Sequence, residues 1–232
     1  MNLPYFYISS HEPGQPEIDL DEDNSRHIVQ VLRMEVGDEM RLTDGKGALV
    51  TAGIAEAHKK RCRVAVRSVE LLPPPAQKVA VAISPLKNAS RFEWFLEKAT
   101  EIGVAEIIPL MTDRTERQHL RPDRLHNILV SALLQSRQTW LPVLQPATPL
   151  VQLLEAPGFD RRLIAWIEER SANAYPSPQA GSTLILIGPE GDFTPEEVAA
   201  ALSRKYIPVT LGKNRLRTET AGVVAATLLC IG

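Results

Sequence analysis

The chain has 232 residues, of which 44% are hydrophobic and 23% charged, a globular composition long enough for one large domain or two unequal ones. Because 26 Lys and Arg nearly balance 28 Asp and Glu, the formal net charge of −2 excludes a global attraction to nucleic acid or to an anionic membrane, so a polyanion site must be a local patch. No apolar run reaches the roughly 18 residues of a membrane span and no signal-type segment opens the chain, so we expect a cytoplasmic protein.

Cysteine and histidine spacing gives no support for a metal site. Cys62 and Cys230 lie far apart, and the five histidines form no ligand pattern such as HExxH. We therefore expect free thiols and no metal.

Short strand-like segments dominate residues 1–72. The runs predict strands at Tyr5–Ile8, Glu39–Asp44, Ala48–Ala57 and Cys62–Val69. The Asp-Gly pair in TDGKGA predicts a tight hairpin, and a helix around Ser25–Met34 would stack Ile28, Val31 and Leu32 on one side. We therefore expect a small β barrel or sandwich, of a size that is marginal for independent stability.

Three consecutive prolines in ELLPPPAQK follow this part of the chain. Each proline fixes φ and removes an N–H donor, which favours a stiff extended connector. We therefore predict a linker at residues 73–78 and a second domain over residues 79–232.

The second domain alternates predicted strands and helices. Strands are expected at Lys78–Ser84, Val104–Leu110, Arg162–Ile167, Thr183–Ile187 and Ile207–Leu211. Helices are expected at Asn88–Gly103, at Pro122–Arg137, from Thr148 with Pro149 at N1, at Pro195–Tyr206 and from Thr218 to the C-terminus. This alternation predicts an α/β domain with a mainly parallel sheet covered by helices.

The ends of two helices carry further signals. Ser90 and Glu93 have the spacing of a capping box, and Gly103 stands at a C-terminal cap position. The final helix, TETAGVVAATLLCI, is apolar almost all the way round. Such a helix is buried, either inside its own domain or against a second subunit.

Loops that follow strands are the candidate ligand sites, because ligands of open α/β sheets bind beyond the carboxyl ends of the strands. One loop follows Leu110, a second, GPEGDFTPEE, follows Ile187, and a third, LGKNRLRTETA, begins at Leu211.

The second loop has two glycines around a Pro-Glu pair. Gly188 and Gly191 allow unusual φ values and close approach of the backbone. Thr194 and Glu197 form a capping box with Pro195 at N1, and this filled cap with its acidic flank disfavours phosphate. Neither GxGxxG nor GxxxxGK[ST] is present. The loop favours an uncharged or cationic ligand edge held by backbone groups, with an ordinary βα turn as the alternative.

The third loop is cationic. Gly212 is followed by Lys213, Arg215 and Arg217, which suit a phosphate or a developing anion, and Thr218 is expected to cap the final helix. A solvated surface turn is the alternative. A further basic stretch, HKKRCRVAVR at His58–Arg67, holds five Lys and Arg and no acid, so it could follow an RNA backbone or form a charged edge strand.

Several of these segments together resemble one protein family. HIVQVLRMEVGDEMRLTDGKG is similar to its N-terminal domain, and EKATEIGVAEIIPL, TERQ, LILIGPEGDFTPEE and LGKNRLRTETA are similar to the methyltransferase domain of the RsmE family. The resemblance implies a 16S ribosomal RNA uridine-N3-methyltransferase that uses S-adenosylmethionine. It also implies a PUA-like β-barrel, a SPOUT-type α/β domain with a C-terminal trefoil knot, and a homodimer that acts on 16S ribosomal RNA or the small ribosomal subunit.

The resemblance assigns functional residues as well. It implies that the adenosine part of the cofactor is held largely by backbone groups of Leu110, Leu186, Ile187, Gly188, Pro189, Glu190, Gly191, Leu211, Gly212 and Leu216. It makes Arg217 the leading candidate to orient substrate or stabilise charge, and Glu219 a weaker catalytic candidate. RNA contacts are expected from Lys59, Lys60, Arg61, Arg63, Arg114, Arg117, Arg137, Lys213 and Arg215. The chain departs from the common EQSGR-like segment, where it has Leu134 in place of the acid and Arg137 with Gln138 in place of Gly-Arg.

Three functions remain open at this point. The first is a ribosomal RNA methyltransferase, the second a non-catalytic RNA-binding or ribosome-assembly factor on the same fold, and the third an α/β enzyme acting on a small nucleotide. The intact GPEG, LG and LRTETA segments favour the first over the second. The separate β domain with its basic strand favours the first over the third.

Overall fold

The structure is a computed structural model that describes residues 3–116, 119–166 and 175–231. Contacts divide the chain into two compact units. The first comprises the residues up to Pro74 together with Leu133–Leu141, and the second comprises Pro75–Ala132 together with the residues from Pro142 onward. No sequence pattern indicated that Leu133–Leu141 belongs with the N-terminal unit, and the domain boundary at residues 73–78 stays a prediction.

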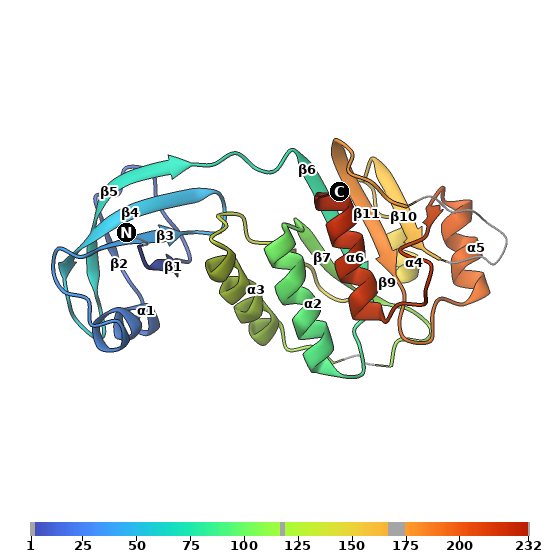
Figure 1. The fold of residues 1–232 in the computed structure, drawn as a ribbon, viewed down its shortest axis with the longest axis horizontal. Coiled ribbons are helices and arrows are strands. Elements are labelled where there is room, and N and C mark those ends of the chain that lie inside the picture. Colours follow the sequence, from blue (N-terminus) through green and yellow to red (C-terminus); the bar gives the residue numbers. More distant parts are fainter. Residues whose placement is uncertain (1–2, 117–118, 167–174, 232) are drawn as a thin grey trace. The chain divides into compact units, whose positions relative to one another are not determined.

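The first unit is built on a curled sheet (Figure 1). Its strands are β1 (Tyr5–Tyr7), β2 (Glu17–Asp19), β3 (Glu39–Thr43), β4 (Ala48–Glu56) and β5 (Arg63–Leu71). They lie in the order β1-β3-β4-β5-β2, with β1 parallel to β3 and the other pairs antiparallel. Met40, Leu42 and Val50 are fully buried in its core. The prediction of a mostly β domain is confirmed, whereas β2 was not predicted.

The helix expected at Ser25–Met34 is wrong in position and type. A short helix α1 (Glu22–Arg26) starts three residues earlier because Asp21 caps it, accepting a hydrogen bond from Asn24 N at 2.8 Å. It continues into a π-helical turn, η1 (His27–Val31). The wider turn breaks the predicted stack, because Ile28 is buried while Val31 is 67% and Leu32 43% exposed.

The connection between β3 and β4 is also longer than the tight hairpin that Asp-Gly predicted. Asp44 Oδ1 accepts hydrogen bonds from Lys46 N at 2.8 Å and Ala48 N at 3.2 Å, which forms a side-chain-stapled loop. Gly47 has a φ of 99°, and a Cβ there would lie 2.6 Å from the ring of Trp140. This close packing inside the unit, in addition to the turn itself, requires the glycine.

The second unit contains the parallel sheet that the strand-helix alternation predicted. Its strands are β6 (Gln77–Ile83), β7 (Glu106–Met111), β8 (Val143–Leu144), β9 (Thr148–Pro149), β10 (Arg161–Ala165), β11 (Gly181–Ile187) and β12 (Ile207–Val209). The order is β12-β10-β11-β6-β7-β8, β9 also pairs with β7, and every pair is parallel. The short strands β8 and β9 were not predicted, and Ile167 of one predicted strand lies outside the described residues.

Helices cover both faces of this sheet. The helices from Pro75 onward are α2 (Ala89–Ile102), α3 (Pro122–Ser136), whose residues from Leu133 belong to the first unit, α4 (Leu150–Leu154), α5 (Pro195–Ser203) and α6 (Thr218–Cys230). Ala80 and Ala82 of β6 share a buried cluster with residues of α4 and α5. On the opposite face α2 and α6 lie side by side (Figure 1), and a Cβ at Gly222 of α6 would lie 2.7 Å from the Phe95 ring and 2.8 Å from Ile83 Cδ1. The trefoil knot stays a prediction.

The helix ends confirm some predicted caps and correct others. Gly103 ends α2 with a φ of 99°, as expected, but Asn88 caps its start by accepting from Ser90 N at 3.0 Å, so the capping box at Ser90 is wrong. Pro149 precedes α4 as its N-cap instead of standing at N1.

Of the N-terminal caps expected for the last two helices, one is confirmed and one is wrong. The capping box of Thr194 and Glu197 at α5 is confirmed, with Pro195 in its first turn. At α6 the N-cap is Arg217, without a side-chain cap, so the expected cap by Thr218 is wrong. In the described part of the chain, no helix has the length and apolarity to cross a membrane.

Candidate functional site

Two of the three candidate loops are joined at the carboxyl edge of the parallel sheet. In the loop after β7, Arg114 Nη1 donates to the carbonyl oxygen of Gly191 at 2.7 Å. Asp113 N donates to Glu197 Oε1 at 2.9 Å, while Thr194 N donates to Glu197 Oε2 at 2.8 Å. Glu197 therefore does more than complete the helix cap, because it also holds the neighbouring loop.

The connection after β6 is fastened to the same place by Glu190. Its Oε1 accepts a hydrogen bond from Lys87 N at 3.2 Å. Thr115 of the loop after β7 reaches the same connection, since its Oγ1 lies 3.4 Å from Ser84 Oγ. The sequence left the role of Glu190 open, and the structure gives it a clamping contact between the ends of adjacent strands.

The two glycines of the second loop are closely packed and do not have unusual φ values. Neither Gly188 nor Gly191 has a positive φ, whereas the following Asp192 has a φ of 64°. A Cβ at Gly188 would lie 3.1 Å from the ring of Phe193, and one at Gly191 would lie 3.3 Å from Arg114 Cδ. The expectation of unusual φ at the glycines is therefore wrong, and the expected close approach is made by side chains of the protein itself.

The positions expected to meet a cofactor differ in exposure. The side chains of Leu110, Leu186, Ile187 and Pro189 are buried, Gly188, Leu211, Gly212 and Leu216 are half-buried, and Glu190 and Gly191 are exposed. Over the part of the chain that the structure describes, the N–H groups of Glu190 and Gly191 donate to no acceptor. The second loop thus presents backbone donors that are free among the described residues, while Leu110 and Leu186 lie within the paired strands β7 and β11.

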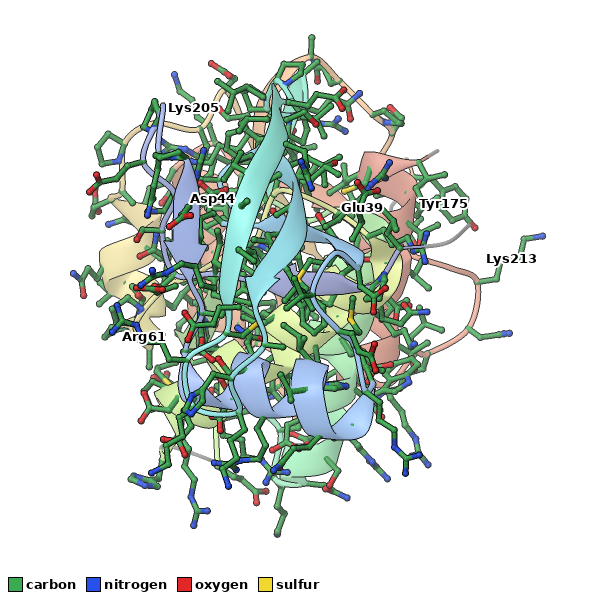
Figure 2. The ribbon with its side chains drawn as sticks, turned by 90° about the vertical axis from the view of Figure 1, so that its left-hand side faces the viewer. Glu39, Asp44, Arg61, Tyr175, Lys205 and Lys213 are labelled. Atoms are coloured by element: carbon green, nitrogen blue, oxygen red, sulfur yellow. The ribbon has the colours of Figure 1, made fainter. Side chains whose placement is uncertain are left out.

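The third loop presents unpaired positive charge. Lys213, Arg215 and Arg217 are exposed and make no ion pair with any described residue, and Figure 2 shows Lys213 extending away from the ribbon of its loop. Thr210 Oγ1 donates to Gly212 O at 3.0 Å within the loop. Gly212 itself has room for a side chain, since the nearest atoms to an added Cβ are 3.9 and 4.0 Å away. No hydrogen bond joins this loop to the other two among the described residues.

Glu219 lies in the first turn of α6, directly after this loop. It is 7% exposed, and its Oε1 lies 3.7 Å from Arg91 Nε of α2. Its Oε2 is buried without a hydrogen-bond partner in the described structure.

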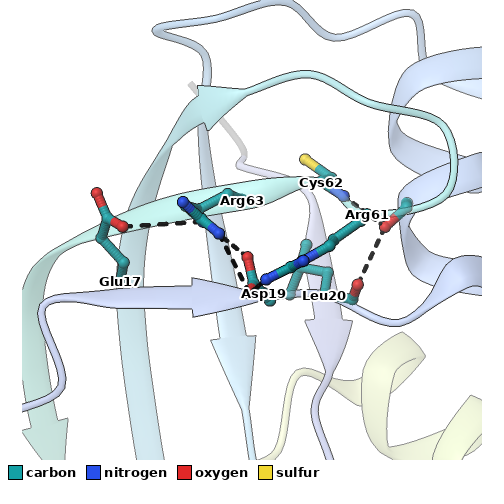
Figure 3. A network of polar contacts seen from close by, with 7 residues as sticks. Glu17, Asp19, Leu20, Arg61, Cys62 and Arg63 are labelled. Atoms are coloured by element: carbon teal, nitrogen blue, oxygen red, sulfur yellow. Dashed lines mark hydrogen bonds and ion pairs between the residues drawn. The ribbon is translucent and has the colours of Figure 1, made fainter.

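The basic segment of the first unit has acidic partners that the sequence analysis missed. Asp19 of β2 accepts hydrogen bonds from Arg63 Nε at 2.8 Å and from Arg61, and Glu17 lies 3.8 Å from Arg63 (Figure 3). The hydrogen bonds from Arg63 and then Arg61 lower the pKa of Asp19 to about 2. Lys59 and Lys60 remain exposed.

Three other predicted RNA contacts are placed differently. Arg114 is engaged with Gly191, as described above, and Arg117 lies outside the described residues. Arg137 is exposed in the first unit with a φ of 57°, beside Gln138, whose carbonyl oxygen accepts from Tyr5 Oη at 2.8 Å. The predicted RNA-binding residues therefore divide between the two units, with Arg137 in the first and Arg114 in the second.

A separate cavity of about 590 Å³ lies between the start of α2 and a second group of residues that comprises Glu116 and residues from His119 to Leu125. Phe92 and Leu125 contribute apolar walls, and Glu116 and Arg121 contribute charge. No residue expected to bind the cofactor lines it. No group of three or more His, Cys, Asp or Glu side chains suited to a metal occurs among the described residues.

Comparison with known proteins identifies the class to which this chain belongs. A family model for RNA methyltransferase domains matches residues 73–230, and one for RNA methyltransferase PUA domains matches residues 20–67. Ribosomal RNA small subunit methyltransferase E of Rickettsia conorii is 27% identical over 97% of this chain and 94% of that protein. The protein of the same name from Mesomycoplasma hyopneumoniae is 35% identical over 66% of this chain and 69% of that protein.

Solved structures agree in fold. A probable rRNA-methyltransferase from Porphyromonas gingivalis is 41% identical, with a TM-score of 0.89 over 97% of this chain and 96% of that one. Ribosomal RNA small subunit methyltransferase E of Neisseria gonorrhoeae, bound to S-adenosyl methionine, is 28% identical, with a TM-score of 0.83 over 97% and 96% of the two chains. The chain belongs to the RsmE family, as its sequence resemblance implied.

Proposed function

We propose that this chain is an S-adenosylmethionine-dependent methyltransferase that methylates N3 of a uridine in 16S ribosomal RNA. Membership of the family supports the reaction class, and the relative from Neisseria gonorrhoeae is a complex with S-adenosyl methionine. The observation that carries the proposal is the clamped loop after β11, whose backbone N–H groups at Glu190 and Gly191 donate to no acceptor among the described residues.

The residues present fit such a cofactor. Adenine offers hydrogen-bonding edges and two apolar faces, which backbone donors and leucine side chains can read without charge. Half-buried Leu211 and Leu216 supply apolar surface, and Gly212 leaves open space beside them. We propose that these residues, with Leu110 and Leu186–Gly191, hold the cofactor, which supplies an electrophilic methyl group when bound.

The charged residues of the third loop then face the RNA. Uridine N3 carries a proton at neutral pH, so removal of this proton for methyl transfer generates negative charge on the base. Arg217 is exposed, unpaired among the described residues and placed at the N-cap of α6, where the helix dipole adds positive potential. We assign it to orienting the base and stabilising this charge, and we assign Lys213 and Arg215 to phosphate contacts.

We assign the RNA contacts of the first unit to Lys59 and Lys60. Arg61 and Arg63 are already paired with Asp19, so they contribute less positive potential than the sequence predicted.

The final helix α6 offers a surface for a second subunit. The half-buried residues Val223 and Leu228 of α6, with Ile231 at 67% exposure, form the face that we propose for this contact. We expect the enzyme to act in the cytoplasm.

Two experiments test this function. Mass spectrometric mapping of ribosomal RNA from cells lacking the gene should show the loss of one N3-methyluridine from 16S RNA, and an unchanged map would refute the substrate assignment. Isothermal titration should show S-adenosylmethionine binding. A protein that binds no cofactor even at low-millimolar concentration would instead fit a non-catalytic RNA-binding factor.

A further inference from the structure

The buried carboxylate at the start of α6 needs an explanation. Glu219 is 7% exposed, and the 3.7 Å between its Oε1 and Arg91 Nε is beyond hydrogen-bond reach. Its Oε2 is buried and has no hydrogen-bond partner among the described residues. A carboxylate oxygen that is buried without a hydrogen bond destabilises a fold, so its presence points to a partner that binds there.

Close packing of α6 against α2 produces this burial. At Gly222, one turn after Glu219, the two helices are so close that a Cβ would lie 2.7 Å from the ring of Phe95. Arg91 precedes Phe95 by one turn of α2 and lies opposite Glu219. The contacts of Gly222 with Phe95 and of Glu219 with Arg91 therefore lie one helical turn apart on the same interface between α2 and α6. The close packing of this interface buries the carboxylate.

Another Glu–Arg pair of the same unit shows the geometry of a fully hydrogen-bonded pair. Arg124 Nε and Nη2 bind Glu93 Oε1 and Oε2 at 2.6 and 2.8 Å, so both carboxylate oxygens are hydrogen-bonded. A pair that served only to join α2 to α6 would be stabilised by the same bidentate geometry. The contact between Arg91 and Glu219 lacks these hydrogen bonds, so Glu219 Oε2 stays available as a hydrogen-bond acceptor.

Arg91 is the movable part of this arrangement. Its side chain is 41% exposed, compared with 9% for the side chain of Glu219, and no hydrogen bond holds it to the carboxylate. An approaching RNA phosphate can therefore draw the guanidinium aside at small cost. Glu219 stands two residues after Arg217, which we assign to the target base, so both groups belong to the N-terminal end of α6.

We propose, building on the function proposed above, that Glu219 is the general base of the reaction. Its Oε2 accepts the proton from N3 of the target uracil once Arg91 has moved. The N3–H bond breaks, and the electron pair left on N3 forms the bond to the methyl carbon. The carbon–sulfur bond of the cofactor breaks with its electron pair remaining on sulfur, and the protonated Glu219 returns its proton to solvent.

The test compares two RNA substrates in single-turnover assays. Small subunits are assembled from transcripts made with uridine or with 5-fluorouridine, and transfer of a labelled methyl group is followed. With uridine RNA, Glu219→Gln should slow transfer by about 10²- to 10⁴-fold, the usual contribution of a general base. With 5-fluorouridine RNA the loss should be at least tenfold smaller, because fluorine acidifies N3 and a base is needed less.

Controls separate this role from a structural one. Cofactor affinity of Glu219→Gln by titration should stay within about threefold of wild type, since the base acts on RNA. If this variant does not fold, Glu219→Asp replaces it. Its rate of methyl transfer should fall less than that of Glu219→Gln, and the fall should again be smaller with 5-fluorouridine RNA than with uridine RNA. Wild-type turnover in Glu219→Gln, or an equal loss on both RNAs, would overturn the assignment. If wild-type protein transfers no methyl group to either RNA, the proposed function fails, which is a distinguishable result.

Discussion

Replacing Gly222 by alanine tests the packing of α6 on α2. An added Cβ would lie 2.7 Å from two ring carbons of Phe95 and 2.8 Å from Ile83 Cδ1, and both of these side chains are fully buried. Overpacking of a core costs about 1–3 kcal/mol, and contacts with two buried groups on different elements place this site near the upper end. Alanine regains roughly 1 kcal/mol of helix propensity, so we expect a net loss of about 2 kcal/mol in the free energy of unfolding.

Urea unfolding followed by tryptophan fluorescence measures this loss, because Trp94 lies on α2 beside Phe95 and is 42% exposed. Gly212→Ala is the matched control, since its nearest neighbours would be 3.9 and 4.0 Å away and its stability should change by less than about 0.5 kcal/mol. Gly103→Ala isolates backbone strain, because φ there is 99° and no atom lies within 4 Å of the new Cβ. A Gly222→Ala protein as stable as wild type would refute the close approach of the two helices.

Four further outcomes are expected. Carbon NMR should find Asp19 titrating near pH 2, and since its pKa is lowered in the fold, the stability difference between wild type and Asp19→Asn should be present above about pH 4 and vanish as the pH falls through 2. Burial raises the pKa of Cys230 to about 11 from its ordinary 9.0, so iodoacetamide should alkylate it about 100-fold more slowly at pH 8 than in urea-unfolded chain. Glu190→Ala removes the hydrogen bond to Lys87 N and should weaken cofactor binding about 2- to 10-fold in a titration, with the melting temperature little changed. Arg217→Ala should abolish methylation while cofactor affinity stays within about tenfold, and normal turnover in that variant would exclude its assigned role.

Local signals in the sequence predicted the fold well. The apolar run of β6, the one-sided apolar repeat of α2 and the capping box at Thr194 each depend on residues close together in the chain, so the sequence alone could locate them. The short strand β2 escaped prediction because three residues preceded by prolines and a glycine have too little pattern of their own, and its partner is more than 40 residues away. As a result the acid beside Arg61 and Arg63 was missed.

The glycines of the second loop show a different limit. The sequence indicated correctly that Gly188 and Gly191 occupy a constrained place, but glycine is required either by φ or by a neighbour that leaves no room for Cβ. Only the positions of Phe193 and Arg114 reveal that the second reason applies. Such contacts join residues that are up to 77 positions apart, and no local pattern encodes them.

The acidic residues of this loop lead to a conclusion about specificity. The sequence indicated Glu197 as part of an acidic flank that disfavours phosphate and left the role of Glu190 open. In the structure each accepts a hydrogen bond from a backbone N–H of a neighbouring connection, that of Lys87 for Glu190 and that of Asp113 for Glu197. They therefore hold the loop against its neighbours through their side chains. Among the described residues of the three loops, positive charge without an ion pair lies in the third loop, at Lys213, Arg215 and Arg217. If the cofactor is held by backbone and the RNA by side chains, substitutions in the third loop should change the choice of RNA while cofactor affinity is retained.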